Sequence, residues 1–244
     1  MALTRWPARR VAALAVALLA MAVLVIAIGR LGRGQPAGAA SPDSRTISVT
    51  APAVRAIDLS GVPGVLTVVG TSGGRARLSG VLHWTGPAAP RATSRLDHSG
   101  RVVHLSYSCA PGSPCTENYR LLVPGRTTTV IRQPSGHVIV SDLAGPLRIR
   151  ASSVDVSATR LRCAVLTAQI TSGHLSARFD VPPRSVSITL TSAQATVWLP
   201  SAAGYAVRSQ VSSGYVHVGV PRAAGTGRTV TARIDQGELQ LLRG

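Results

Sequence analysis

The chain has 244 residues, enough for one or two domains, and its 26 basic residues against nine acidic ones give a formal net charge of +17. All 26 basic residues are arginine. Aromatic residues make up 3 % of the chain and apolar residues 45 %. A core must therefore be built from aliphatic side chains, and the apolar content excludes disorder over most of the chain.

An apolar run from Val11 to Ile28 contains only Ala, Val, Leu, Ile and Met. As a helix rising about 1.5 Å per residue it would span roughly 27 Å, which is just enough to cross a bilayer. Three arginines precede the run and two follow it, so the positive-inside rule favours a cytoplasmic N-terminus. We predict a cytoplasmic segment, a single-pass anchor, a flexible linker rich in Gly, Ala and Pro, and an extracytoplasmic domain, over residues 1–10, 11–28, 29–45 and 46–244.

A cleaved signal peptide is the alternative to an anchor, because Ala37-Gly38-Ala39 has the small-x-small form of a peptidase site. That site lies far beyond the apolar run, with Arg30 and Arg33 between them. The hydrophobic part of a signal peptide usually has only about 7 to 15 residues. The sequence favours the uncleaved anchor and leaves cleavage open.

The three cysteines fit an extracytoplasmic domain. Cys109 and Cys115 flank a segment with two prolines and a glycine, which could bring the sulfurs within bonding range, and outside the cell such a pair could form a disulfide. Cys163 has apolar neighbours, as expected for a buried free thiol. His104 with the two paired cysteines lacks zinc-ligand spacing, so we predict no metal site.

A repeat of about twenty residues is the most informative feature of the chain. Segments such as Thr171–Leu175 and Ser212–Val216 align on a small residue at positions 173, 193, 214 and 237, at intervals of 20, 21 and 23 residues. Similar segments continue the series upstream. The predicted repeat corners are Gly74, Gly100, Gly136, Ser153, Gly173, Ala193, Gly214 and Gly237.

Apolar residues alternate on both sides of each corner, which is typical of strands with one buried face. Leu175 and Ala177 follow the corner at Gly173 by two and four residues, and Ile170 precedes it by three. This odd separation indicates a corner or bulge that resets the alternation. Prolines after the second strand, as in Leu199-Pro200 and Val220-Pro221, should end it.

These patterns predict an all-β fold, a solenoid-like stack of β-strand repeats preceded by one N-terminal transmembrane helix. Successive coils would lie about 4.8 Å apart. The alternative is a sandwich of hairpins, which favours two-residue Asn-Gly or Asp-Gly turns. The chain has one asparagine, Asn118, and neither dipeptide.

The repeated Ser-Gly-x-hydrophobic-x-hydrophobic units, the anchor before them and the Leu-Pro or Val-Pro strand ends resemble the putative-adhesin β-strand-repeat domain, of toast-rack type, found in bacterial envelope proteins. The likeness covers roughly Thr46–Gly244 and is clearest from Thr129 onward, while residues 83–120 interrupt the repeat. The resemblance implies an extracytoplasmic scaffold or adhesion role without catalysis, and it supplies no catalytic residue.

The segments that resemble catalytic or ligand-binding motifs in this chain are better explained as parts of the strand repeat. Gly70–Gly74 matches the G-x-S-x-G nucleophile motif around Ser72, but a strand pattern, not the required helix, follows it. No phosphate-binding glycine motif opens a helix, so we expect no cofactor. His137, His174 and Tyr215 share one position after the corner, and stacking would align them in an outward row. We predict a protein that is not an enzyme.

The predicted external domain keeps 20 arginines and eight acidic residues over positions 46–244, a net charge of +12. Such a charge attracts anions. We expect no nucleic acid outside a membrane, which leaves anionic wall polymers or lipid headgroups as ligands. Arginines clustered on one face would favour binding, whereas an even distribution would favour a merely soluble surface.

The predicted function is a structural or adhesive role at the cell envelope, with possible contact to anionic wall or lipid components. The alternative is a sensor or regulatory subunit in envelope stress signalling that binds a partner protein. The last repeat, with Leu239, Leu241 and Leu242, has no capping helix after it. We predict that its open edge self-associates or is covered by the N-terminal part of the chain.

Overall fold

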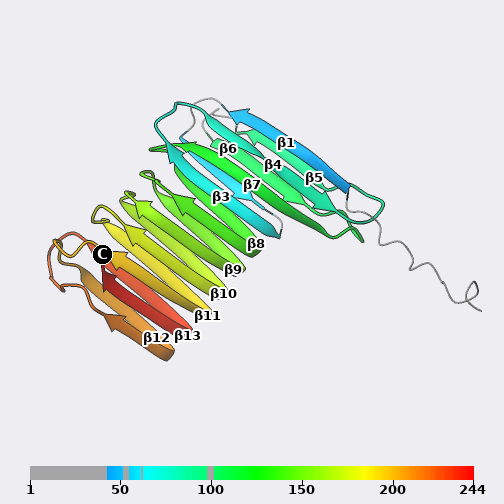
Figure 1. Cartoon of the computed structure of the whole chain (residues 1–244). Coiled ribbons are helices and arrows are strands. Elements are labelled where there is room, and N and C mark those ends of the chain that lie inside the picture. Colours follow the sequence, from blue (N-terminus) through cyan, green and yellow to red (C-terminus); the bar gives the residue numbers. More distant parts are fainter. Residues whose placement is uncertain (1–42, 52–54, 62, 98–101) are drawn as a thin grey trace, which may run out of the picture. The chain divides into compact units, whose positions relative to one another are not determined.

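The computed structural model of the chain describes residues 43–51, 55–61, 63–97 and 102–244. These residues form one 13-stranded sheet (Figure 1). Its strands are β1 (Asp43–Ala51), β2 (Ala56–Ser60), β3 (Gly64–Thr71), β4 (Ala76–Trp84), β5 (Arg91–Leu96), β6 (Val102–Ser108), β7 (Cys115–Pro124), β8 (Thr128–Ser141), β9 (Leu147–Leu161), β10 (Val165–Phe179), β11 (Ser185–Leu199), β12 (Ala206–Val218) and β13 (Thr229–Arg243).

The prediction of an all-β fold is confirmed for the described residues. The predicted cytoplasmic segment, anchor and most of the linker lie outside them, and β1 begins within the segment predicted as linker. Among the described residues there is no helix long and apolar enough to span a membrane.

Each long strand of the repeat region is one coil with two segments. Neighbouring coils pair in parallel, and the pairing skips one residue in the middle of every strand. The first segment precedes this corner and the second follows it. The skipped residues are Pro134, Ser152, Thr171, Thr191, Ser212 and Asp235. Pro134 has no N–H to donate, so an unpaired corner position suits it.

The order of the coils differs from their order in the chain at both ends. In the repeat region the strands run β8, β9, β10, β11, β13, β12. The predicted open edge at Leu239–Leu242 is therefore wrong, because β13 lies between β11 and β12 and is paired on both sides. The edge is β12. Among the described residues, its strand partner is β13 alone.

At the other end, shorter strands complete the coils. β2 and β3 provide the first and second segments beside β8, and β6 and β7 provide the next pair. The stretch around residues 102–124, which in the sequence interrupts the repeat, thus forms a further parallel coil. Antiparallel β5 pairs with β6, and antiparallel β4 and β1 continue from β7. These antiparallel strands end the stack of parallel coils.

The corner row is the set of aligned residues that lie two positions after the skipped residue of each coil. It consists of Gly64, Gly136, Val154, Gly173, Ala193, Gly237 and Gly214. All five glycines in it have positive φ, between 107° and 150°. A Cβ on Gly173 would lie 2.3 Å from the carbonyl oxygen of Val154, so both the backbone conformation and the space require glycine there.

Two of the predicted corners lie elsewhere. Ser153 pairs with Ser135 and Ser172, one residue before the corner row, and Val154 holds the row position. Gly74 lies in the exposed turn between β3 and β4, and Gly64 takes its place in the row. Gly100 lies outside the described residues. Gly136, Gly173, Ala193, Gly214 and Gly237 occupy the corner row.

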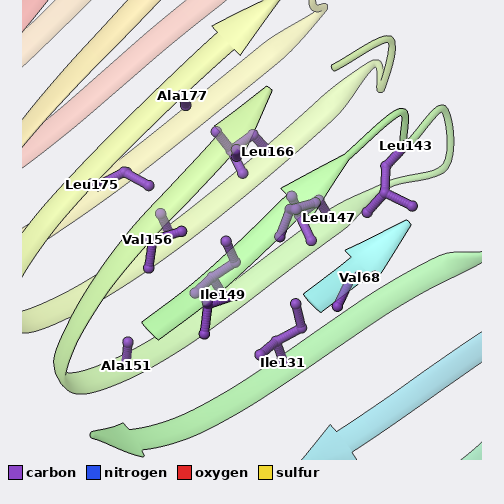
Figure 2. Close-up of a cluster of buried hydrophobic side chains, with 14 of the residues drawn as sticks. Val68, Ile131, Leu143, Leu147, Ile149, Ala151, Val156, Leu166, Leu175 and Ala177 are labelled. Carbon is purple, nitrogen blue, oxygen red and sulfur yellow. The ribbon is translucent and has the colours of Figure 1, made fainter. Parts of the chain in front are cut away.

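One aliphatic core fills the interior of the stack between the two sets of segments. In β9, Leu147, Ile149 and Ala151 are buried before the corner and Val156 after it (Figure 2). Val154, also after the corner, is buried as well. The same alternation recurs in the neighbouring coils. Fully burying one such leucine or isoleucine side chain contributes about 1.5–3 kcal/mol. Aligned rows of branched side chains thus stabilise each coil against the next.

We predict that Gly173→Ala lowers the free energy of unfolding by about 1–3 kcal/mol or more, because the new Cβ meets the Val154 carbonyl at a positive φ. Ala193→Gly is the matched control at the same row position, where φ is ordinary, and should cost at most about 1 kcal/mol. Urea denaturation of both variants measures the difference. Equal losses would contradict this account of the corner.

Candidate functional site

Arginines gather on the outer face formed by the first segments. Over β2 and the coils β8 to β13, the outward positions of these segments carry five arginines and one aspartate. They are Arg132, Arg148, Arg150, Arg208, Arg233 and Asp58. We call this surface the basic face. The remaining outward positions are mostly Thr, Ser and Gln, for example Thr167 and Gln169 on β10.

The outer face of the second segments has a different charge. Its alternating outward positions over the same coils hold Asp155, Glu238 and Arg178, and Arg160 and Arg243 are also exposed near the ends of β9 and β13. Arg178 packs over the ring of Trp198, with its guanidinium carbon 5.3 Å from the ring centroid. Five arginines of the repeat region thus lie on the basic face and three on the second segments, so the first segments carry the larger share of the positive charge on the strands.

The centre of the basic face is a row in register across three coils. Arg132 pairs with Arg150, and Arg150 pairs with Gln169. Beside this row lies an open hollow of about 430 Å³, which Ser152 and Thr171 at the corners also line. Guanidinium, amide and hydroxyl groups all donate hydrogen bonds, and two arginines on adjacent coils suit a phosphate or carboxylate group.

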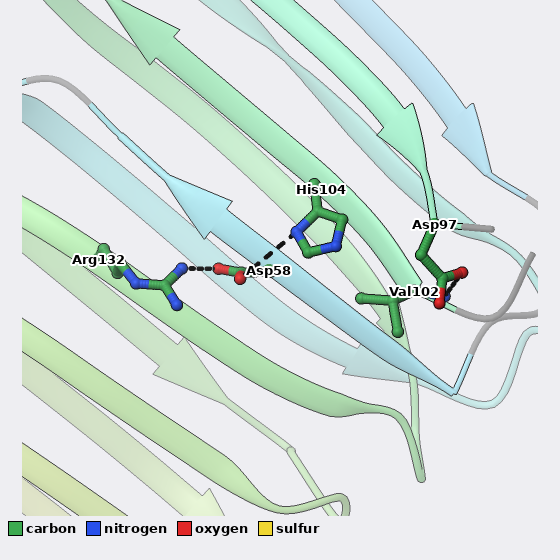
Figure 3. Close-up of polar contacts among 5 residues, drawn as sticks. All are labelled: Asp58, Asp97, Val102, His104 and Arg132. Carbon is green, nitrogen blue, oxygen red and sulfur yellow. Dashed lines mark hydrogen bonds and ion pairs between the residues drawn. The ribbon is translucent and has the colours of Figure 1, made fainter. Parts of the chain in front are cut away.

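Asp58 neutralises part of the charge at one end of the basic face. Its carboxylate accepts a hydrogen bond from Arg132 and lies 3.5 Å from Nδ1 of His104 (Figure 3). The Arg132 side chain remains 42 % exposed. The first segments of β8, β9 and β10 hold no acidic residue at their described outward positions. No carboxylate at these positions therefore neutralises Arg148 or Arg150.

The second segments carry a polar row in which His137, Asp155, His174, Gln194, Glu238 and Tyr215 stand side by side. The register confirms the predicted alignment of the two histidines and the tyrosine. Asp155 lies 3.8 Å from His137. The side-chain hydrogen bond between Tyr215 and Glu238 raises the pKa of the phenol and lowers the pKa of the carboxyl group. This row has mixed charge and suits no single class of ligand.

Two consecutive turns carry an ion pair in an unusual backbone conformation. Asp142 and Arg160 have φ of 60° and 51° and are the only non-glycine residues with positive φ in the described part of the chain. Arg160 donates two hydrogen bonds of 2.7 Å to the Asp142 carboxylate. This contact links the end of β8 to the end of β9, and the Arg160 hydrogen bond holds the pKa of Asp142 below its usual range.

The cysteines lie apart from the basic face. Cys109 and Cys115 form a disulfide at the corner between β6 and β7, with their Cα atoms 5.4 Å apart. The bond removes the two thiolates that a zinc site with His104 would need, and the described residues contain no cluster of metal-ligating side chains. Cys163 is buried, and burial raises its pKa to about 11, so the thiol stays protonated and unreactive near neutral pH.

Strand β7 carries a buried carboxyl group that the sequence patterns did not identify. Glu117 is 1 % exposed and is the register partner of Gly64. Its Oε1 and that of Gln133 lie where a side chain on Gly61 would be. The pKa of Tyr107 is raised, mainly because its hydroxyl group is buried and to a lesser extent because Glu117 is near. The ring centroids of Tyr107 and Tyr119 lie 4.7 Å apart. The alternating pattern of β7 places Glu117 inward, but its polarity masks this in the sequence.

Ser72 lies in the turn that joins β3 to β4. No described helix follows it, so the local geometry is that of a strand connection and not of a nucleophile elbow. The hollow nearest to this turn is lined by Thr50, Arg75, Arg77 and Leu122 among others, and none of its lining residues is a histidine or an acid.

Comparisons with known proteins agree with the sequence-based family prediction over the repeat region. Residues 128–238 match the family model Toastrack DUF4097. The crystal structure of a "putative cell adhesion protein" from Clostridium sporogenes is similar, with a TM-score of 0.49 and 12 % identity, covering 83 % of this chain and 100 % of that chain. A "putative adhesin" from Bacteroides fragilis gives a TM-score of 0.48 and 12 % identity, covering 82 % and 97 %. A search of the curated proteins found no significant match.

We predict that removing the disulfide by the double change Cys109→Ser and Cys115→Ser lowers the free energy of unfolding by about 2 kcal/mol, the chain-entropy value for a loop of this length. Thermal unfolding of the full chain with and without the two changes measures the loss. Treatment with a reducing agent should reproduce it in the native chain and leave the double variant unaffected. An unchanged melting temperature would contradict a structural role for the bond.

A second prediction concerns acid stability. Because the folded pKa of Asp142 is lowered, its pair with Arg160 stabilises the fold above the ordinary carboxyl pKa and is lost as the pH falls through the folded value. Asp142→Asn should therefore reduce stability at pH 7 but have less effect at pH 2–3. Asp155→Asn, an exposed carboxylate on the next coil, is the control. Denaturation curves at the two pH values test this, and a pH-independent effect of Asp142→Asn would contradict it.

Proposed function

We propose that this chain, which carries a Toastrack DUF4097 domain at residues 128–238, is a membrane-anchored extracytoplasmic protein that binds anionic polymers or surfaces of the cell envelope through its basic face. The role is adhesive or structural. The observation that carries the proposal is the gathering of five arginines on the first segments, where Asp58 is the one acidic residue among the described outward positions.

The geometry of the face supports a repeating anion as its ligand. Neighbouring parallel coils are about 4.8 Å apart, so the backbones of Arg132 and Arg150 are separated by one such interval. Gln169 continues the row on the next coil. Between these arginines and Arg233 lie hydroxyl side chains on β10 and β11, which donate further hydrogen bonds. A linear chain of phosphodiester or carboxylate groups laid across the coils would meet donors at each step.

Several features support placing the domain outside the membrane. The apolar run at 11–28, with more arginines before it than after it, favours an anchor with an external C-terminal part. The disulfide between Cys109 and Cys115 is of a kind that persists in oxidising compartments. The solved structures with similar folds include proteins described as putative adhesins, which agrees with a surface role.

The test removes charge from the basic face alone. Arg132, Arg148 and Arg150 are changed together to Gln, and Arg77, Arg120 and Arg178, which are exposed on the other set of strands, form a control triple with the same loss of charge. The full chain is placed in nanodiscs of zwitterionic lipid. Fluorescence anisotropy then measures its binding to a soluble poly(glycerol phosphate). Co-flotation with phosphatidylglycerol vesicles forms the second arm.

We expect the first triple to weaken binding on the order of 100-fold, since a basic side chain near an anionic surface contributes about 1 kcal/mol, and the control triple to weaken it far less. The arm that shows this difference identifies the source of the anion as wall-type polymer or lipid headgroup. Equal losses for the two triples would show that only net charge matters. Absence of binding in both arms would overturn the proposal.

A further inference from the structure

The end of the stack at β12 has an open hydrogen-bonding edge. Ala206–Val218 pairs through one side with β13, and its other side faces no strand among the described residues. Most of its residues are exposed, including Val211 at 37 % and Tyr215 at 55 %. Open strand edges carry rows of unpaired N–H and C=O groups and recruit further strands.

β12 lacks the features by which proteins usually protect such an edge. Its 13 residues contain no proline and no acidic side chain, and Arg208 is the one strongly basic residue. The corner at Gly214 stays in register with Gly237, so no irregular bulge turns the strand away. The opposite end of the parallel stack differs, because antiparallel β4 and β5 continue from its last coil. The two ends are therefore not equivalent.

The edge is complementary to itself under a two-fold rotation about an axis through its corner. Such a rotation lays the first segment of one copy antiparallel over the second segment of the other. Val207 then faces Val218, and Ser209 faces Val216, so the inward rows of the two copies continue each other. Gln210 faces Tyr215 and Arg208 faces His217 in the outward rows. Inward residues thus pair with inward residues and outward residues with outward residues, as an antiparallel ladder requires.

We propose that two copies of this chain associate through their β12 strands, which pair antiparallel about this axis and join the two stacks end to end. The corner favours a second copy as the occupant over an unrelated peptide. Gly214 has φ of 111°, and a straight strand could follow only one of the two segments on either side of it. The β12 of a second copy has the same corner at the same place.

The dimer also covers apolar side chains that the fold leaves partly open. Val207, Val216 and Val218 pack against the core from its last row, with no further coil beyond them. Pairing supplies that coil and extends the aliphatic interior from one copy to the next. Because each copy has one such end, a two-fold contact closes and does not propagate into a fibre.

Cross-linking tests the predicted pairs. One tagged full chain carries Gln210→Cys and a second, differently tagged chain carries Tyr215→Cys, and both are mixed in detergent under mild oxidation. Directly opposed residues have Cβ atoms about 4.5–5.5 Å apart, so we expect the mixed disulfide to form at least tenfold faster than either chain bonds to its own kind. Ser157→Cys with Ser176→Cys, outward positions in mid-stack of which Ser157 is exposed and Ser176 half-buried, is the control pair.

A second variant tests the association without new cysteines. Val211→Lys places a charge on the edge, and Val181→Lys is the control, because Val181 is 46 % exposed in the turn after β10. Analytical ultracentrifugation in detergent should give a dimer for the native chain and for Val181→Lys, and a monomer for Val211→Lys. A monomeric native chain at high concentration would overturn the proposal. So would a mixed disulfide that forms no faster than that of the control pair.

Discussion

The structure depends on one constraint, the in-register parallel pairing of coils that all skip a residue at the same corner. Because the skip is shared, inward side chains of each coil meet inward side chains of the next in both segments. The aliphatic core and the outward rows are two consequences of the same register. A shift by one residue in a single coil would turn its apolar side chains outward on both segments.

The same register brings arginines that are distant in the sequence together on the basic face. Arg132 and Arg150 are 18 residues apart in the chain, yet they are direct partners on neighbouring strands. The acidic Asp155 and Glu238 follow their corners and fall on the other set of segments. Five arginines thus precede the corner and form the basic face, with Asp58 as the one acidic residue among its described outward positions. The ladder holds the backbone at these positions, so binding has to order the arginine side chains but not the backbone.

Much of the fold was predictable, because the repeat encodes it locally. The alternation around Gly173 and Gly214 predicted strand segments with a corner between them, and the spacing near twenty residues predicted the parallel stack. The position of Ser153 was wrong by one residue, since Val154 fills a row that glycine or alanine fills elsewhere, and only the hydrogen-bond register identifies it.

The exchange of β12 and β13 could not be predicted. Both strands fit the repeat equally well, and chain order placed β13 last. What separates them is packing: Val230, Ile234 and Leu239 are fully buried between two coils, whereas β12 is mostly exposed. Asp58 and Glu117 were also missed as partners of the stack, because a carboxylate on a short strand carries no periodic signal. Tertiary contacts decide such positions, and residue type alone does not.

The most direct test of the shared register is the rate of disulfide formation within one chain between cysteines placed on neighbouring coils. Ser157 and Ser176 are partners on β9 and β10, beyond the corner. The account predicts that cysteines at 157 and 176 bond rapidly, and that a pair at 157 and 174, displaced by two residues along the strand, bonds much more slowly. Equal rates, or a faster displaced pair, would contradict the in-register stack.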